Sequence, residues 1–136
     1  MTVELGIASG KVCGVVVTYH PDSSVVANVT AMVRECGDVI VVDNGSAPVA
    51  IAGIAALSGV EVILLGENRG LAAALNRGAK RALERGCGWI VTFDQDSCPE
   101  SGMVAALLRL GSRFANSALV GPVIVEDGFQ ASQYRW

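Results

Sequence analysis

The amino-acid sequence predicts an α/β domain in which helices cover both faces of a mostly parallel sheet, an α/β/α arrangement of three layers. Short runs of β-branched residues recur without polar alternation, which is typical of strands buried on both faces. Segments with apolar residues at helical spacing separate these runs. Hydrophobic residues make up 51% of the 136 residues and charged residues 17%, so one domain of this size can bury a substantial core.

The first expected strand covers residues 12–18, and a helix follows it. The strand reads Val-Cys-Gly-Val-Val-Val-Thr, a run with no polar alternation. Asp22 is the expected N-cap of the helix, apolar residues then recur at helical spacing, and Gly37 ends it. These two elements form the first β–α unit.

Two further β–α units are expected in the middle of the chain. A strand at 39–42 is closed by the turn sequence Asp-Asn-Gly-Ser at 43–46, and a weaker helix covers 48–57. The third strand, 60–65, leads into a long helix at 71–85. The apolar face expected for this long helix consists of Leu71, Leu75, Ala79, Ala82 and Leu83.

The fourth strand is expected at 89–93, where a buried apolar run ends in two carboxylates separated by one residue. Ser97 and Glu100 have the spacing of a capping box, which predicts a helix that begins there and runs towards Phe114. A fifth strand is expected at 119–125. Strand and helix therefore alternate along the whole chain.

Composition excludes several classes of function. The formal net charge is −3, and the basic residues form no patch with interleaved aromatic residues, so no nucleic-acid partner is expected. Only one histidine is present and no cysteine pair has metal-ligand spacing, so a zinc cluster is not expected. The expected buried thiols are Cys13, Cys36, Cys87 and Cys98.

No targeting or membrane-spanning segment is expected in this sequence. The first ten residues lack the basic start and long apolar core of a signal peptide. The uncharged stretch 44–60 is shorter than the roughly 20 apolar residues that a membrane span needs. The chain is therefore expected to be cytoplasmic, with the cytoplasmic face of a membrane as an alternative location.

Polar clusters follow directly on four of the expected strands. Because parallel strands all end at one edge of a sheet, these clusters should converge in a Rossmann-like domain. Open α/β sheets bind ligands in the crevice outside that edge. The clusters are Thr18-Tyr19, Asp43-Asn44, Glu67-Asn68 and Asp94-Gln95-Asp96.

The chemistry of these clusters favours a nucleotide held with a metal ion. The first strand is not followed by the glycine fingerprint of dinucleotide-binding folds, and the sequence contains no Walker A motif. Tyr19 is a candidate stacking ring and Asp43 a candidate acceptor for a base imino proton. Asp94 and Asp96 suit Mg²⁺ or Mn²⁺, because oxygen ligands bind hard cations. The alternatives are that Tyr19 only packs at the rim and that the two acids only cap a helix.

Four segments, in this order and spacing, carry a family resemblance: Val16 to Pro21, Val41 to Ser46, Glu67 to Asn76 and Phe93 to Ser97. They resemble the family 2 glycosyltransferases, and within that family they are most similar to the rhamnosyltransferase branch. The resemblance covers nearly all of residues 12–125. It implies the nucleotide-binding half of a GT-A fold and an inverting, metal-dependent transfer of a sugar from a nucleotide diphosphate.

The resemblance also implies roles for residues, with a DXD motif at Asp94 to Asp96. A dTDP- or UDP-sugar is the implied donor and a glycan or lipid-linked molecule the implied acceptor, as in polysaccharide biosynthesis. The alternative for Asn68 is that it only caps the helix that follows. The alternative for Asn76 is that its amide only lies on the helix surface. The implied metal ligands are Asp94 and Asp96. The implied nucleotide-sugar-binding residues are Thr18, Tyr19, Asp43, Asn44, Asn68, Gly70, Asn76, Asp94 and Gln95.

An inverting transferase also needs a general base, which the family places well beyond the DXD motif. We expect it beyond Trp136, so residues 12–125 are expected to form a donor-binding half-domain between a flexible N-terminus, 1–11, and a tail, 126–136. Exposed apolar surface would then favour self-association. A non-catalytic nucleotide-binding or assembly module is the alternative function. A sugar-1-phosphate nucleotidyltransferase is less favoured, because no glycine-rich basic loop follows the first strand.

Overall fold

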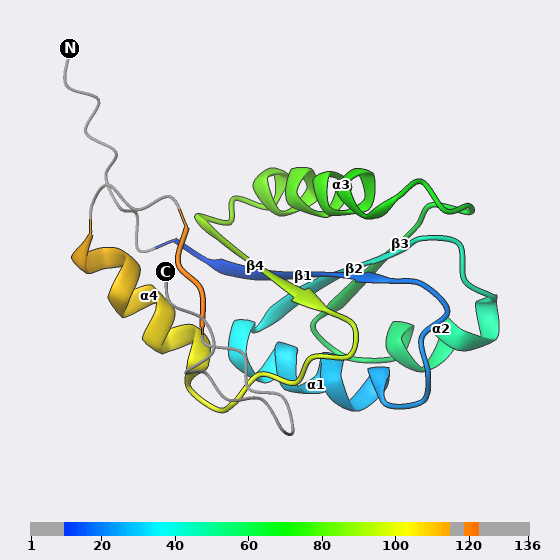
Figure 1. Cartoon of the computed structure of the whole chain (residues 1–136), viewed down its shortest axis with the longest axis horizontal. Coiled ribbons are helices and arrows are strands. Elements are labelled where there is room, and N and C mark those ends of the chain that lie inside the picture. The colour runs from blue at the N-terminus through cyan, green and yellow to red at the C-terminus, as the bar shows by residue number, and fades with distance from the viewer. Residues whose placement is uncertain (1–9, 115–118, 123–136) are drawn as a thin grey trace, which may run out of the picture.

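The computed structural model describes residues 10–114 and 119–122, and within them four parallel strands form one sheet (Figure 1). The strands are β1 (Val12–Thr18), β2 (Asp38–Asp43), β3 (Val60–Leu64) and β4 (Trp89–Asp94), in the order β3-β2-β1-β4. Thr18 pairs with Asp43, and Val17 pairs with Asp94. All four strands therefore end at one edge, and the predicted α/β fold class is confirmed.

Helices cover both faces of the sheet because alternate strand residues point to opposite sides. α1 (Val25–Cys36), α2 (Pro48–Ala55) and α4 (Met103–Arg113) lie on one face, and α3 (Leu71–Glu84) lies on the other (Figure 1). The first face buries Val16, Val41 and Phe93 against α1, α2 and α4. The second buries Val15 and Val42 against α3. The three-layer arrangement is thus present in the described residues.

The apolar face predicted for α3 is wrong in two of its five members. Leu71 and Leu83 are 60% and 65% exposed, whereas the buried residues of the helix are Ala74, Gly78 and Ala82. These small residues recur every fourth position and form one stripe. They let the helix backbone lie close to the sheet, where leucine would not fit. Leucine spacing therefore misidentified the face that meets the core.

The predicted capping box of α4 is also wrong. Ser97 and Glu100 lie in the loop before the helix, which begins only after Gly102 (φ 83°). The carboxylate of Glu35, in α1, caps it instead: the Gly102 N–H donates to Oε1 at 2.8 Å and the Val104 N–H to Oε2 at 3.0 Å. A carboxylate near a helix N-terminus satisfies free N–H groups and complements the helix dipole. This cap comes from far away in the sequence.

Replacing Glu35 by alanine is expected to loosen the start of α4. The loss of an N-terminal cap costs about 1 kcal/mol of unfolding free energy. Urea unfolding measures that loss, and amide hydrogen exchange should speed up at Gly102 and Val104 in particular. Glu35→Gln, which keeps one carbonyl acceptor, should show a smaller effect. Equal exchange rates at these two amides in wild type and Glu35→Ala would contradict the capping role.

Other element boundaries differ only slightly from the prediction. Asp22 is not the N-cap of α1, because that position is Ser24; Asp22 instead accepts a 2.8 Å bond from the Ser24 N–H just before the helix. Gly37 ends α1 as predicted, with φ 80° and its N–H bonded to the Val33 carbonyl. Residues 119–122 contain no strand. The rest of the predicted fifth strand, the whole predicted tail at 126–136 and residues 1–9 of the predicted N-terminal segment lie outside the described residues.

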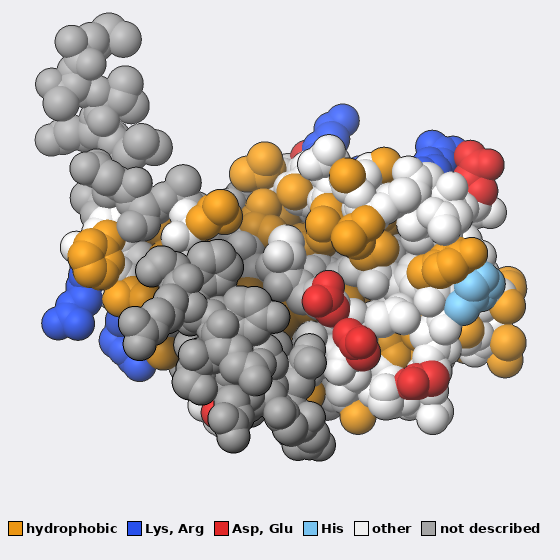
Figure 2. Space-filling view, viewed as in Figure 1, with side chains coloured by type: hydrophobic (Ala, Val, Ile, Leu, Met, Phe, Trp, Pro, Cys, Tyr) orange, Lys and Arg blue, Asp and Glu red, His pale blue; other side chains and the backbone are white. Residues whose placement is uncertain are grey.

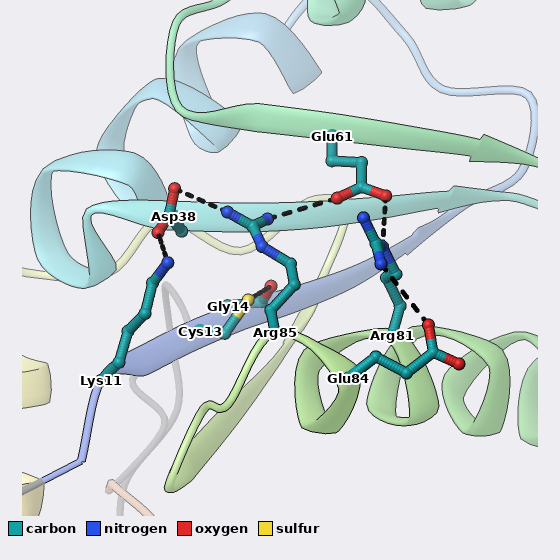
Figure 3. A network of polar contacts seen from close by, with 8 residues as sticks. All are labelled: Lys11, Cys13, Gly14, Asp38, Glu61, Arg81, Glu84 and Arg85. Carbon is teal, nitrogen blue, oxygen red and sulfur yellow. Dashed lines mark hydrogen bonds and ion pairs between the residues drawn. The ribbon is translucent and has the colours of Figure 1, made fainter.

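The edge of the sheet where the strands begin carries a network of ion pairs (Figure 3). Arg85 bridges two acids, with 3.1 Å to Asp38 and 3.4 Å to Glu61. Lys11 binds Asp38 at 2.6 Å and Arg81 binds Glu61 at 2.6 Å. The hydrogen bond from Lys11, supported by Arg85, holds the pKa of the Asp38 carboxyl below its usual value. The charges at this edge are paired with one another, so they join the residue before β1 to β2, β3 and the end of α3.

The cysteines are mostly packing groups, as predicted for three of the four. Cys13 and Cys87 are buried and Cys36 is half-buried, but Cys98 is exposed and the prediction is wrong there. Burial raises the pKa of Cys13 to about 11 and that of Cys36 to about 12. Thiols with such pKa values are protonated near neutral pH and are poor nucleophiles.

No helix in the described ranges is long and apolar enough to cross a membrane. Several large apolar side chains are exposed, including Val49 at 84% and Leu64 at 67%. Self-association through such surface stays a prediction, which sedimentation velocity over a range of protein concentrations would check.

Candidate functional site

A cavity of about 420 Å³ opens at the edge where the strands end, between the end of β4 and the first turns of α3. In Figure 2 acidic side chains lie beside a hydrophobic patch on this face of the molecule. One wall is apolar and another carries carboxylates, so the exposure of Leu71 is explained by its place in the wall. The residues that line the cavity are Val17, Leu71, Leu75, Thr92, Phe93, Asp94, Gln95 and Asp96.

Asp94 and Asp96 are the acidic residues of this cavity, and both are exposed. Phe93, buried just before them, anchors the strand, and the Ser97 N–H donates to the Asp94 carbonyl at 3.1 Å to form a turn. Within the described residues no third acid, histidine or cysteine joins them in a metal-binding group. Two adjacent carboxylates can hold a hard cation that takes its other ligands from water or a phosphate. The donor set fits Mg²⁺ or Mn²⁺.

Gln95 joins this loop to the loop after β1. The Tyr19 N–H donates to the Gln95 Oε1 at 2.9 Å, and the Gln95 Nε2 donates back to the Tyr19 carbonyl at 3.2 Å. From α1, the Asn28 side-chain amide donates to the Gln95 carbonyl at 3.1 Å. The acidic loop is therefore tied to two other elements through its middle residue.

The Asp43 carboxylate lies at the end of β2 and is only 2% exposed. Its Oδ1 accepts the hydroxyls of Thr18, at 2.9 Å, and Ser46, at 2.6 Å. Its Oδ2 accepts the N–H groups of Gly45, at 3.2 Å, and Ser46, at 2.8 Å. A carboxylate has about four acceptor positions, and all of them are filled from within the chain. A base imino proton would have to displace one of these donors.

Asn44 and Asn68 connect the loop after β2 to the loop before α3. The Asn44 amide donates to the Asn68 Oδ1 at 3.0 Å, and the Asn44 Oδ1 accepts the Arg69 N–H at 2.8 Å. The Asn68 Oδ1 also accepts the Gly70 N–H at 2.9 Å. A side chain at Gly45 would meet the Glu67 backbone at 2.9 Å, so the two loops pack directly on each other. Asn68 thus organises the entry to α3.

The model of the family described as glycosyl transferase family 2 matches residues 15–135. The chain belongs to glycosyl transferase family 2. The resemblance drawn from its four motifs is thereby confirmed at the level of the family.

This family 2 chain is also 31% identical over 122 residues to a Shigella flexneri protein named dTDP-rhamnosyl transferase RfbF. The match covers 87% of this chain and 40% of that protein. The chain therefore spans less than half the length of the relative that it matches.

The structure brings some of the predicted site residues of this family 2 chain together and leaves others apart. Asp94 and Asp96 line the cavity as a pair, whereas Thr18 is fully buried. Tyr19 is 45% exposed and its ring lies 4.2 Å from that of His20, outside the cavity lining. Asn76 is exposed on α3 and is not part of that lining either.

Sequence reasoning missed the apolar wall of the cavity. Leu71 and Leu75 were assigned to the apolar face of α3 that meets the core. Leu71 is exposed and lines the cavity instead, whereas Leu75 packs against the core and lines the cavity as well. It also missed Ser46 and Asn28, whose bonds fix the loops. A hydroxyl three residues after Asp43 was the one available signal, since Asp and Ser at this spacing form turns.

Proposed function

We propose that this chain is the donor-binding half of a glycosyltransferase that uses a deoxysugar, such as rhamnose, activated on dTDP or UDP. Within a longer protein the sugar would pass, with inversion, to a glycan or lipid-linked acceptor. The observation that carries the proposal is the cavity in which Asp94 and Asp96 face an apolar wall at the edge where the strands end. Family membership and the likeness to a protein named as a dTDP-rhamnosyl transferase support it.

The carboxylates of Asp94 and Asp96 would hold Mg²⁺ or Mn²⁺ beside the donor diphosphate. A bound cation supplies positive charge that stabilises the charge developing on the leaving diphosphate. The chain itself contributes orientation and dehydration: Leu71 and Leu75 offer an apolar surface to the base or to the sugar methyl group. A deoxysugar that carries a methyl group in place of a hydroxymethyl group has no hydroxyl there to desolvate, so its contact with the apolar wall carries no desolvation cost.

The loops after β1 and β2 would receive the nucleoside. The ring of Tyr19 is exposed and can stack on a base. Asp43 can bond a base only by giving up a donor, and Ser46, which is half-buried, is more easily displaced than the buried Thr18 hydroxyl. Asn44, Asn68 and Gly70 would then act by holding the loops in place.

Replacing Asp96 by alanine is expected to abolish the effect of Mn²⁺ on dTDP binding. In the native chain Mn²⁺ should tighten dTDP binding by about tenfold, since a cation held by the two carboxylates would attract the negatively charged diphosphate. Without Mn²⁺ the two proteins should bind dTDP equally. Isothermal titration calorimetry in the four combinations of protein and metal measures this.

Glu100→Ala is the matched control, because Glu100 is an exposed carboxylate four residues further along that does not line the cavity. It should keep the full Mn²⁺ effect. Equal dTDP binding in all four combinations would overturn the metal site and favour a non-catalytic nucleotide-binding module. Parallel titrations with UDP test the base, and tighter binding of UDP than of dTDP would contradict a dTDP donor.

A further inference from the structure

Gln95 lies between two carboxylates that line the cavity, but its own side chain is engaged elsewhere. Its amide oxygen accepts the Tyr19 N–H at 2.9 Å and its amide nitrogen donates to the Tyr19 carbonyl at 3.2 Å. Within the described residues, neither the Asp94 nor the Asp96 carboxylate takes part in a side-chain hydrogen bond or ion pair. The middle residue of the loop is therefore anchored, and the two acids beside it stay available to a ligand.

The Gln95 amide continues the pairing of β1 with β4 beyond the point where the backbones separate. The last backbone pair in the register is Val17 with Asp94. Beyond Val17, the next backbone N–H and carbonyl on the β1 side that face β4 are those of Tyr19. The side-chain amide of Gln95 has one carbonyl and one N–H to offer them, as a peptide group of β4 would. Because the side chain makes these bonds, the backbone at 94–96 is free to turn towards the cavity.

A second anchor holds the same residue from the other layer. The Asn28 amide, in α1, donates to the Gln95 backbone carbonyl at 3.1 Å. Gln95 is thus tied to β1 through its side chain and to α1 through its backbone. The position of the two acids relative to the sheet then depends on one residue between them.

We infer that Gln95 is a positioning residue, which sets Asp94 and Asp96 at the separation that lets both bind one cation. This inference rests on the proposed function, since it gives the pair a metal ion to hold. Two like charges one residue apart repel each other, so without an anchor the loop would relax into conformations that separate them. Anchoring the loop before the cation arrives removes this ordering cost from binding.

The test is Gln95→Met, which keeps the length of the side chain and removes both bonds to Tyr19. We expect the Mn²⁺-dependent gain in dTDP affinity, which is the ratio of the affinities measured by calorimetry with and without metal, to fall about fivefold. Mn²⁺ alone, titrated by electron paramagnetic resonance, should also bind more weakly. The Tyr19 amide should exchange its hydrogen faster. Asn28→Ala should change the Mn²⁺ gain in the same direction and by less.

Ser97→Ala is the control in the same loop, because its backbone bond to Asp94 is kept, and it should behave as wild type. An unchanged Mn²⁺ gain in Gln95→Met, with a native chain that shows the gain, would overturn the positioning role. A parallel loss of metal-free and metal-dependent dTDP binding would overturn it too, since it would mean general damage. If Mn²⁺ does not raise the dTDP affinity of the native chain, the proposed function and this inference are both overturned. The native chain is therefore measured first.

Discussion

Replacing Asp43 by alanine is expected to lower the free energy of unfolding by about 3 kcal/mol. The Asp43 carboxylate is 2% exposed and accepts four hydrogen bonds, two from hydroxyls and two from backbone N–H groups. Its removal leaves the Thr18 hydroxyl without a partner in a position with no exposure to water. The turn at 44–46 loses the group on which it is built. Urea unfolding followed by circular dichroism measures the change.

Two smaller changes separate the contributions to this network. Ser46→Ala removes one of the four donors and also the acceptor of the His20 N–H. It should cost about 1 kcal/mol, the usual net contribution of one hydrogen bond, because the bond from His20 is exposed and adds little. Thr18→Val removes another donor while keeping the shape of the side chain, and should cost about as much. An Asp43→Ala variant no less stable than these would show that the carboxylate does not organise the turn.

The positions of the strands along the chain were predictable because the pattern that indicates a buried strand lies within the strand itself. The valine-rich runs at 12–18 and 39–42 lack polar alternation, and such runs become central parallel strands wherever helices separate them. Parallel strands end at one edge, so the location of Asp43 and Asp94 at the same edge of the sheet also followed from the pattern. The cap of α4 did not, because Glu35 comes from another helix and no spacing rule connects it to Gly102.

The apolar wall of the cavity could not be predicted either, because it depends on how α3 packs against the sheet. Leu71 and Leu75 have the spacing of a core face, and periodicity does not tell which of two apolar stripes on a helix meets the sheet. The deciding factor is the separation between helix and sheet, which depends on the small residues at 74, 78 and 82. Leu71, which is exposed, and Leu75, which still packs against the core, then form the apolar wall of the cavity. Core packing and site composition are thus set by the same stripe.

Replacing Gly78 by alanine is expected to lower the free energy of unfolding by about 2 kcal/mol, although alanine is the better helix former by roughly 1 kcal/mol. A Cβ at this position would overlap with Cγ1 of Val15 and lie 3.1 Å from Cγ2 of Val42, and both of these side chains are fully buried. Neither valine can move without disturbing its own strand, so α3 would have to move away from the sheet. Urea unfolding measures the loss of stability.

Such a shift would also move the cavity wall, since α3 carries Leu71 and Leu75 at its first two turns. Gly78→Ala should therefore weaken dTDP binding at a temperature where the variant is still folded. Gly53→Ala is the matched control: Gly53 is exposed in α2, and its nearest contact would be Cγ2 of the half-buried Val26 at 3.1 Å. That change should leave stability unaltered or raise it by up to about 1 kcal/mol. If Gly78→Ala stabilised the protein as Gly53→Ala does, the close approach of α3 to the sheet would be disproved, and with it the reason that leucines line the cavity.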